Sequence, residues 1–204
     1  MKINSPTSLI RRHLLIAATL ATALCTLGSV AVRAAITPAL LDNFADPQHT
    51  PAGAGRFLVD DNAAGSHSHA TQHCANGVLT VEGELVPGRG VPAFVSVPLL
   101  LSPDAKPRDL TGYEGVRLRI KVTKGIIILQ VASAEVQNFD FHASAPLAGT
   151  RGEFQEVRIP FKDLKRAWSE QTALNLKTIT SVNLVAFGMA PGTFTYEVKE
   201  VGFY

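Results

Sequence analysis

Short stretches of alternating apolar and polar residues run along most of the chain, and turn residues separate them. Between Val116 and Val122 the apolar residues take every second position, and Arg117, Arg119 and Lys121 take the others. A period of two is typical of a strand with one buried and one solvated face. Ten segments predict strands: Leu40–Phe44, Arg56–Val59, Val78–Leu85, Phe94–Leu100, Val116–Val122, Ile126–Ala132, Asn138–Ala143, Phe154–Ile159, Ile179–Phe187 and Phe194–Phe203.

The last predicted strand changes phase within its length. Its apolar residues alternate in one phase over Phe194–Val198 and in the other over Val201–Phe203. A one-residue bulge near Lys199-Glu200 would bring both sets to the core. The only expected helix is one or two turns near Phe161–Trp168, after Pro160 ends a strand. Many strands and almost no helix predict an all-β sandwich or barrel.

The N-terminal segment has a different pattern. Lys2 and the pair Arg11-Arg12 precede a long apolar run that ends in small residues before Ala35. This order predicts a secretory signal peptide over residues 1–34, and the arginine pair resembles a twin-arginine export signal. We therefore expect one domain at residues 35–204, a periplasmic or secreted location, and no membrane span after cleavage.

Charge and cysteine content bound the mature domain further. Residues 1–34 contain four basic residues and no acidic one, so removing them changes the formal net charge from +2 to −2. Nothing in this balance indicates nucleic-acid binding. About 170 residues remain, enough for a sizeable core in one domain. Only Cys74 remains after processing, so no intrachain disulfide can form and the core must supply the stability.

Four segments occur in a suggestive order: Leu41-Asp-Asn-Phe-Ala-Asp, Asp60-Asp-Asn-Ala-Ala-Gly-Ser, Asp109-Leu-Thr-Gly-Tyr-Glu-Gly-Val-Arg-Leu-Arg and Val157-Arg-Ile-Pro-Phe-Lys-Asp-Leu. In this order, the chain from roughly Leu40 to Tyr204 resembles the complex I intermediate-associated protein 30 family. That family is a branch of the galactose-binding-like jelly rolls and also resembles some carbohydrate-binding modules. The resemblance implies a jelly-roll β-sandwich of two antiparallel sheets and a non-catalytic binding or assembly-assisting role. The expected export departs from the mitochondrial members.

A histidine-rich segment stands where that family usually has Met-Gly-Gly-x-Ser. It packs four candidate metal ligands into eight residues: His67, His69, His73 and Cys74. Imidazole and thiolate are preferred ligands of Zn and Cu, and His-x-His on an extended segment points both rings to one side. Asp60 and Asp61 could add an oxygen or orient a ring. Three interpretations stay open: a Zn or Cu site, a solvated loop, or a loop that binds a nonmetal ligand.

A second candidate site lies in Asn138-Phe-Asp-Phe-His142. Alternation puts three polar side chains on one face: Asn138, Asp140 and His142. Phe139 and Phe141 then point to the core. A polar row beside an aromatic ring is how jelly-roll sheets bind sugar hydroxyls, and the available rings are Trp168 and Tyr113. Trp168 lies in a polar context, and both a surface position and half-buried packing fit it.

Enzyme signatures are poor in residues 35–204. There is no Gly-x-Ser-x-Gly elbow, phosphate loop or dinucleotide fingerprint. Cys74 beside His73 is a weak nucleophile pair, because successive strand residues face opposite sides. We expect a binding or assembly module for an unidentified protein partner or a carbohydrate. The alternative is a metal-binding protein or metal-dependent enzyme that uses the histidine segment.

Overall fold

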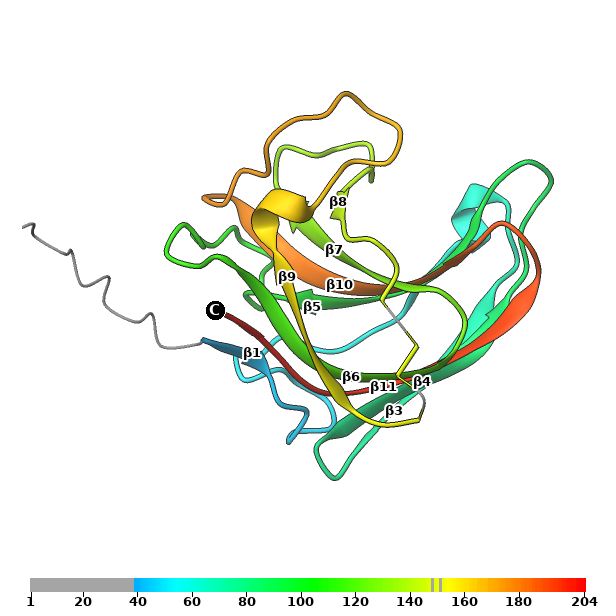
Figure 1. Ribbon diagram of the computed structural model, residues 1–204, viewed down its shortest axis with the longest axis horizontal. Coiled ribbons are helices and arrows are strands. Elements are labelled where there is room, and N and C mark those ends of the chain that lie inside the picture. Colours follow the sequence, from blue (N-terminus) through cyan, green and yellow to red (C-terminus); the bar gives the residue numbers. More distant parts are fainter. Residues whose placement is uncertain (1–38, 148, 151) are drawn as a thin grey trace, which may run out of the picture. The chain divides into compact units, whose positions relative to one another are not determined.

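Two antiparallel β-sheets pack face to face in the computed structural model, which describes residues 39–147, 149–150 and 152–204 (Figure 1). The predicted signal peptide therefore lies outside the described residues. The strands are β1 (Leu40–Asp42), β2 (Val59–Asp60), β3 (His69–Ala75), β4 (Val78–Leu85), β5 (Ala93–Leu100), β6 (Gly115–Lys124), β7 (Ile127–Ser133), β8 (His142–Ala143), β9 (Gln155–Pro160), β10 (Ile179–Gly188) and β11 (Gly192–Phe203). One sheet has the order β3-β4-β11-β6-β9, with β1 also paired to β11, and the other has the order β2-β5-β10-β7-β8.

Helical structure is limited to two short 3₁₀ turns in the described residues, η1 (Asn62–Ala64) and η2 (Phe161–Asp163). The helix expected near Phe161–Trp168 is therefore shorter than its predicted range. It ends early because Lys165 pairs with Ala143 in an isolated bridge, which pulls the chain back to an extended conformation. Across the same described ranges, no helix is long and apolar enough to cross a membrane.

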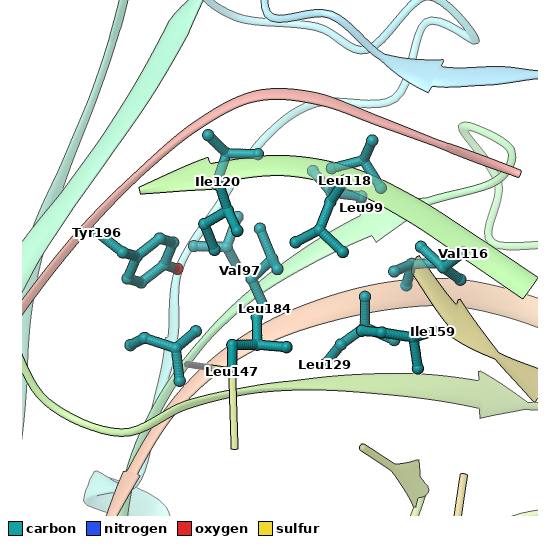
Figure 2. Packing of buried hydrophobic residues seen from close by; sticks show 14 of the residues in the cluster. Val97, Leu99, Val116, Leu118, Ile120, Leu129, Leu147, Ile159, Leu184 and Tyr196 are labelled. Atoms are coloured by element: carbon teal, nitrogen blue, oxygen red, sulfur yellow. The ribbon is translucent and has the colours of Figure 1, made fainter. Parts of the chain in front are cut away.

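The core lies between the two sheets, and β6 shows how the sequence pattern produces it. Val116, Leu118 and Ile120 are fully buried, whereas Arg119 is exposed, which confirms the predicted faces. Figure 2 shows Leu118 and Ile120 above Leu184 of the opposite sheet, with the Tyr196 ring beside them. The hydrophobic effect of this burial is the main stabilising term, since the cysteine within the described residues, Cys74, is free.

The phase change in β11 is a bulge, as predicted. Val198 pairs with Ile120, but Glu200 pairs with the next residue back, Arg119. Lys199 is therefore the extra residue, and the apolar side chains on both sides of it reach the core. Phe194, Tyr196, Val198, Val201 and Phe203 are all buried.

Two strand predictions were wrong in ways that matter for function. The histidine segment was expected as a loop, but His69–Ala75 forms β3, an edge strand that pairs with β4. Its inward positions hold small or polar side chains, so hydrophobic periodicity did not reveal it. The strand expected over Asn138–Ala143 shrinks to β8, because Phe139 adopts a left-handed conformation with φ of 60°.

Candidate functional site

Two loops that are far apart in the sequence meet beside β7 and β8, and their residues form what we call the aromatic corner. It consists of Asn138, Phe139, Asp140, Arg166, Trp168 and Ser169. Figure 1 shows the two loops next to each other at one end of the five-stranded sheet, the first leaving β7 and the second leading to β10. Three of the four residues predicted to bind a ligand, Asn138, Asp140 and Trp168, lie in this corner, and hydrogen bonds join their loops.

Asp140 is a clamp. Its side chain is 1% exposed, and its carboxylate accepts backbone N–H bonds from Ala167 at 2.8 Å, Trp168 at 3.1 Å and Ser169 at 2.6 Å. Desolvation alone would raise the pKa of Asp140, but the hydrogen bonds from Ser169, Ala167 and Trp168 outweigh it and lower the pKa. The carboxylate therefore fixes the backbone that carries the Trp168 ring, and it has no free face for a sugar hydroxyl.

Asn138 and Arg166 tie the two loops together a second time. Asn138 donates through Nδ2 to Ser169 Oγ at 2.9 Å and accepts at Oδ1 from Arg166 Nη2 at 3.0 Å. Arg166 Nε also donates to the Asp140 carbonyl at 3.1 Å. These bonds link the residue before Phe139 to the residue after Trp168.

The two rings of the corner face solvent. Trp168 is 69% exposed, which settles its position at the surface, and Phe139 is 76% exposed. The prediction that Phe139 belongs to the core is wrong, because its positive φ turns the side chain away from the alternation of a strand. A left-handed conformation destabilises a residue other than glycine by about 1–2 kcal/mol. Phe139 also meets Phe141 edge to face, with ring centroids 6.2 Å apart.

His142 and Tyr113 make contacts inside the domain and lie outside the aromatic corner. His142 is buried, and its Nε2 lies 2.8 Å from the Thr172 carbonyl, an arrangement in which Nε2 donates. Its Nδ1 is buried without a partner among the described residues. Tyr113 packs on Phe203 with centroids 5.5 Å apart. The structure therefore does not place the His142 imidazole where a surface ligand would meet it.

The histidine segment holds its imidazoles at the surface, with His67 before the edge strand β3 and His69 and His73 on it. His67, His69 and His73 are all exposed, and His69 Nε2 lies 3.9 Å from Glu84 Oε2 on β4. At a rise of about 3.3 Å per residue, His69 and His73 lie about 13 Å apart along the strand. No group of three or more His, Cys, Asp or Glu side chains in the described part of the chain is placed to hold a metal ion.

Cys74 lies on the opposite side of β3 from the histidines. Its thiol donates to the Phe44 carbonyl at 3.3 Å, and it borders a hollow of about 330 Å³ together with Arg56 and Gln72. Partial desolvation raises the pKa of the Cys74 thiol and so disfavours the thiolate that binds metal. The structure does not bring Cys74 to the predicted metal ligands.

Asp61 and Asp60 accept hydrogen bonds from backbone and serine groups. Asp61 is fully buried and accepts hydrogen bonds from Ser68 N at 3.0 Å, Ser68 Oγ at 2.6 Å and Phe94 N at 2.8 Å. Asp60 accepts a backbone bond from Asn62. Asp61 therefore joins the start of β3 to β5, which is a structural role.

Sequence reasoning missed the outer face of the five-stranded sheet. Val182 and Leu184 point to the core, so Asn183 between them points outward, and it pairs in register with Pro98 of β5 and Gln130 of β7. Asn183 is 5% exposed, and its Oδ1 has no hydrogen-bond partner among the described residues. The signal in the sequence was a single polar residue, Asn183, within the apolar run Val182–Phe187, which indicates a polar position on the outer face of this strand.

Comparisons with known proteins agree with this architecture. A family model described as Complex I intermediate-associated protein 30 matches residues 43–198. A comparison with curated proteins finds no match. A family 11 carbohydrate-binding module from Clostridium thermocellum, solved in complex with a β-1,3-1,4-mixed-linked tetrasaccharide, is similar with a TM-score of 0.54 and 13% identity, over 81% of this chain and 94% of that chain.

A second solved structure, a family 30 carbohydrate-binding module, is similar with a TM-score of 0.50 and 13% identity, over 82% of this chain and 98% of that chain. At this level of identity the likeness shows the fold alone. The predicted jelly-roll β-sandwich of two antiparallel sheets is thereby confirmed.

Proposed function

The chain belongs to the complex I intermediate-associated protein 30 family, and on that premise we propose that it is an exported, non-catalytic binding module for a carbohydrate. The fold it shares with carbohydrate-binding modules supports this proposal. So does the shape of the five-stranded sheet, whose outer side is concave in Figure 1 and flanked by loops at both ends. A concave face with a few polar groups among apolar ones is typical of a small-molecule site.

The observation that carries the proposal is the buried amide oxygen of Asn183, which has no hydrogen-bond partner among the described residues. A buried acceptor without a hydrogen bond destabilises a fold by about 1–3 kcal/mol. A sugar hydroxyl that donates to Asn183 Oδ1 would relieve this penalty, and Gln130 lies directly across from it on β7. Phe94 and Phe187 pair in register farther along the same face, where their rings offer apolar contact.

Binding to a glycan array, followed by calorimetry with the best oligosaccharide, tests this function. We expect Asn183→Ala to weaken binding by about fivefold, since one hydrogen bond contributes about 1 kcal/mol. Arg119→Ala is the matched control, because Arg119 is exposed on the outer face of the other sheet. If the wild type binds no glycan, the carbohydrate is ruled out and the alternative of a protein partner takes its place.

Export is the second part of the proposal. It rests on the charged start and apolar run of residues 1–34. We expect the mature protein to begin at Ala35 and to be found in the periplasm or the medium. N-terminal sequencing of exported protein checks this, and an intact Met1 would refute it.

One observation favours a metal-binding role. His67 and His69 are both exposed and two residues apart, and Glu84 lies near His69. Zn or Cu(II) would be the metal, as these favour imidazole. This stays a prediction about the histidine segment, and its test is given in the Discussion.

A further inference from the structure

We propose that Trp168 and Phe139 form a prebuilt aromatic site that stacks on the apolar face of a sugar ring, and that Asp140 positions this site without touching the ligand. The inference deepens the proposed function and rests on it. It assigns the ligand contact to Phe139, which sequence alternation had placed in the core, and removes it from Asp140 and His142.

The first argument is exposure. Seven large apolar side chains are exposed in the described part of the chain, and two of them, Trp168 and Phe139, belong to this corner. The loops that carry them are joined by the Asn138–Ser169 hydrogen bond, one residue away from each ring. Two exposed rings held on neighbouring backbones are a feature that folding alone does not require.

The second argument is rigidity. Three successive N–H groups, from Ala167 to Ser169, bond to one buried carboxylate, and Gln171 closes the same loop by donating to the Arg166 carbonyl at 2.7 Å. The backbone under Trp168 is thus ordered before any ligand arrives. Preorganisation reduces the entropy lost on binding.

The third argument is the backbone strain at Phe139. A ring that is mostly in solvent gains little from burial, yet it sits at a φ of 60° where glycine fits without strain. Such residues gather at binding sites, where the surrounding structure holds them. The strain therefore points to a use for the Phe139 ring outside the fold.

A sugar suits this corner better than a protein partner. Two rings make a small apolar surface, whereas a stable protein interface covers about 800 Å² on each side. Asn138 precedes Phe139 and Ser169 follows Trp168 in the chain, and a hydrogen bond joins them. Asn138 is exposed and Ser169 is half-buried, so the hydroxyls of a stacked sugar can reach their polar atoms.

Trp168 is the only tryptophan of the chain, so tryptophan fluorescence, excited selectively over tyrosine, reports on this corner alone. The probes are the β-1,3-1,4-mixed-linked tetrasaccharide and the oligosaccharide bound best on the glycan array. We expect binding to shift Trp168 emission to the blue, and Trp168→Ala to lower calorimetric affinity by about tenfold or more. Leu40→Ala, at an exposed apolar position on β1, should leave affinity unchanged.

Phe139→Gly separates binding from folding. It should lower affinity while the urea midpoint stays equal or rises, because glycine removes the strain. If Phe139→Gly lowers the urea midpoint together with the affinity, or leaves the affinity unchanged, the proposed role of the Phe139 ring is overturned.

Asp140→Asn tests positioning. It should lower both affinity and Trp168 fluorescence anisotropy while far-UV circular dichroism keeps the β signal. Because the folded pKa of Asp140 is lowered, wild-type affinity should hold above the ordinary aspartate pKa of about 3.9 and fall only at more acidic pH. Arg166, with Nε 3.8 Å from Asp140 Oδ2, is the charged group that faces it. Asp140→Asn should lack this acid step.

The outcomes separate the inference from the proposed function. Carbohydrate binding by the wild type that Trp168→Ala and Phe139→Gly leave intact overturns the aromatic site and keeps the function. An Asp140→Asn variant with wild-type affinity and anisotropy overturns the positioning role. Absence of any glycan binding by the wild type overturns both.

Discussion

The aromatic corner and the histidine segment, which includes the edge strand β3, both present side chains to solvent. A buried aspartate holds each of them by hydrogen bonds. Asp140 bonds to three consecutive N–H groups of the loop that carries Trp168, while Asp61 bonds to Ser68 and Phe94 and so joins two strands. The first clamp fixes an irregular loop in one conformation. The second leaves the histidines on a regular strand, where side chains on one face are spaced by the strand itself.

The difference shows that local density of reactive residues is not the same as convergence in space. The imidazoles are close in sequence but run along an edge strand, and Cys74 points to the other side. The rings of the corner are far apart in sequence, yet side-chain hydrogen bonds bring their loops together. Preorganisation, which favours tight binding, is therefore found in the corner and not on the strand.

Replacing either buried aspartate, Asp61 or Asp140, should give the largest losses in unfolding free energy. Asp61→Ala leaves three donors of the β3–β5 junction unpaired, and we expect a loss of about 3–5 kcal/mol in unfolding free energy. Asp140→Ala should destabilise by about 2–4 kcal/mol, since the loop it holds can regain water as a partner. Urea unfolding followed by circular dichroism measures both.

Asp46→Ala is the control for these variants, because Asp46 is exposed and accepts backbone bonds from Gln48 and His49 in a surface turn. It should remain close to the wild type. Equal unfolding midpoints for Asp46→Ala and Asp61→Ala would show that the hydrogen bonds of a buried aspartate stabilise the fold no more than those of an exposed one. Neither region would then be held by its buried aspartate.

Much of the fold follows from patterns in the sequence, because long strands bury apolar residues at every second position. Val78–Leu85 forms β4 with the predicted bounds, and the bulge at Lys199 follows from a phase change. The resemblance rests on residues that serve the fold. Asp42, for example, is fully buried and pairs with Arg56 through bonds of 2.7 Å and 2.9 Å.

The candidate site was harder to predict, since it depends on contacts between distant segments. Asn138, Asp140 and Trp168 could be named from their residue types, but the alternation rule fails at Phe139, whose φ is positive. Nothing local in the sequence says that Asp140 bonds to residues 167–169. Position 183 shows the reverse case, where a polar residue in an apolar strand was a visible signal.

The smallest effects should come from the histidine strand, and metal titration decides its role. Two imidazoles, His67 and His69, share one side of an extended segment, and Glu84 lies near the second. We predict that binding of Zn or Cu(II) depends on this pair and is weak, because no group of three metal-ligating side chains forms among the described residues and both imidazoles are solvated. The protein should be titrated by calorimetry without a histidine tag.

His67→Ala/His69→Ala should abolish the binding heat, whereas Cys74→Ala should preserve it, because the thiol faces Phe44 on the other side of β3. Urea midpoints should match the wild type for the double histidine variant, since both side chains are exposed. Acid should release the metal, because imidazole binds metal only when neutral. Undiminished binding in the double variant would place the metal elsewhere, and no binding by the wild type would identify the strand as a solvated surface. Either result would leave the aromatic corner, with its fixed backbone, as the stronger candidate for ligand recognition.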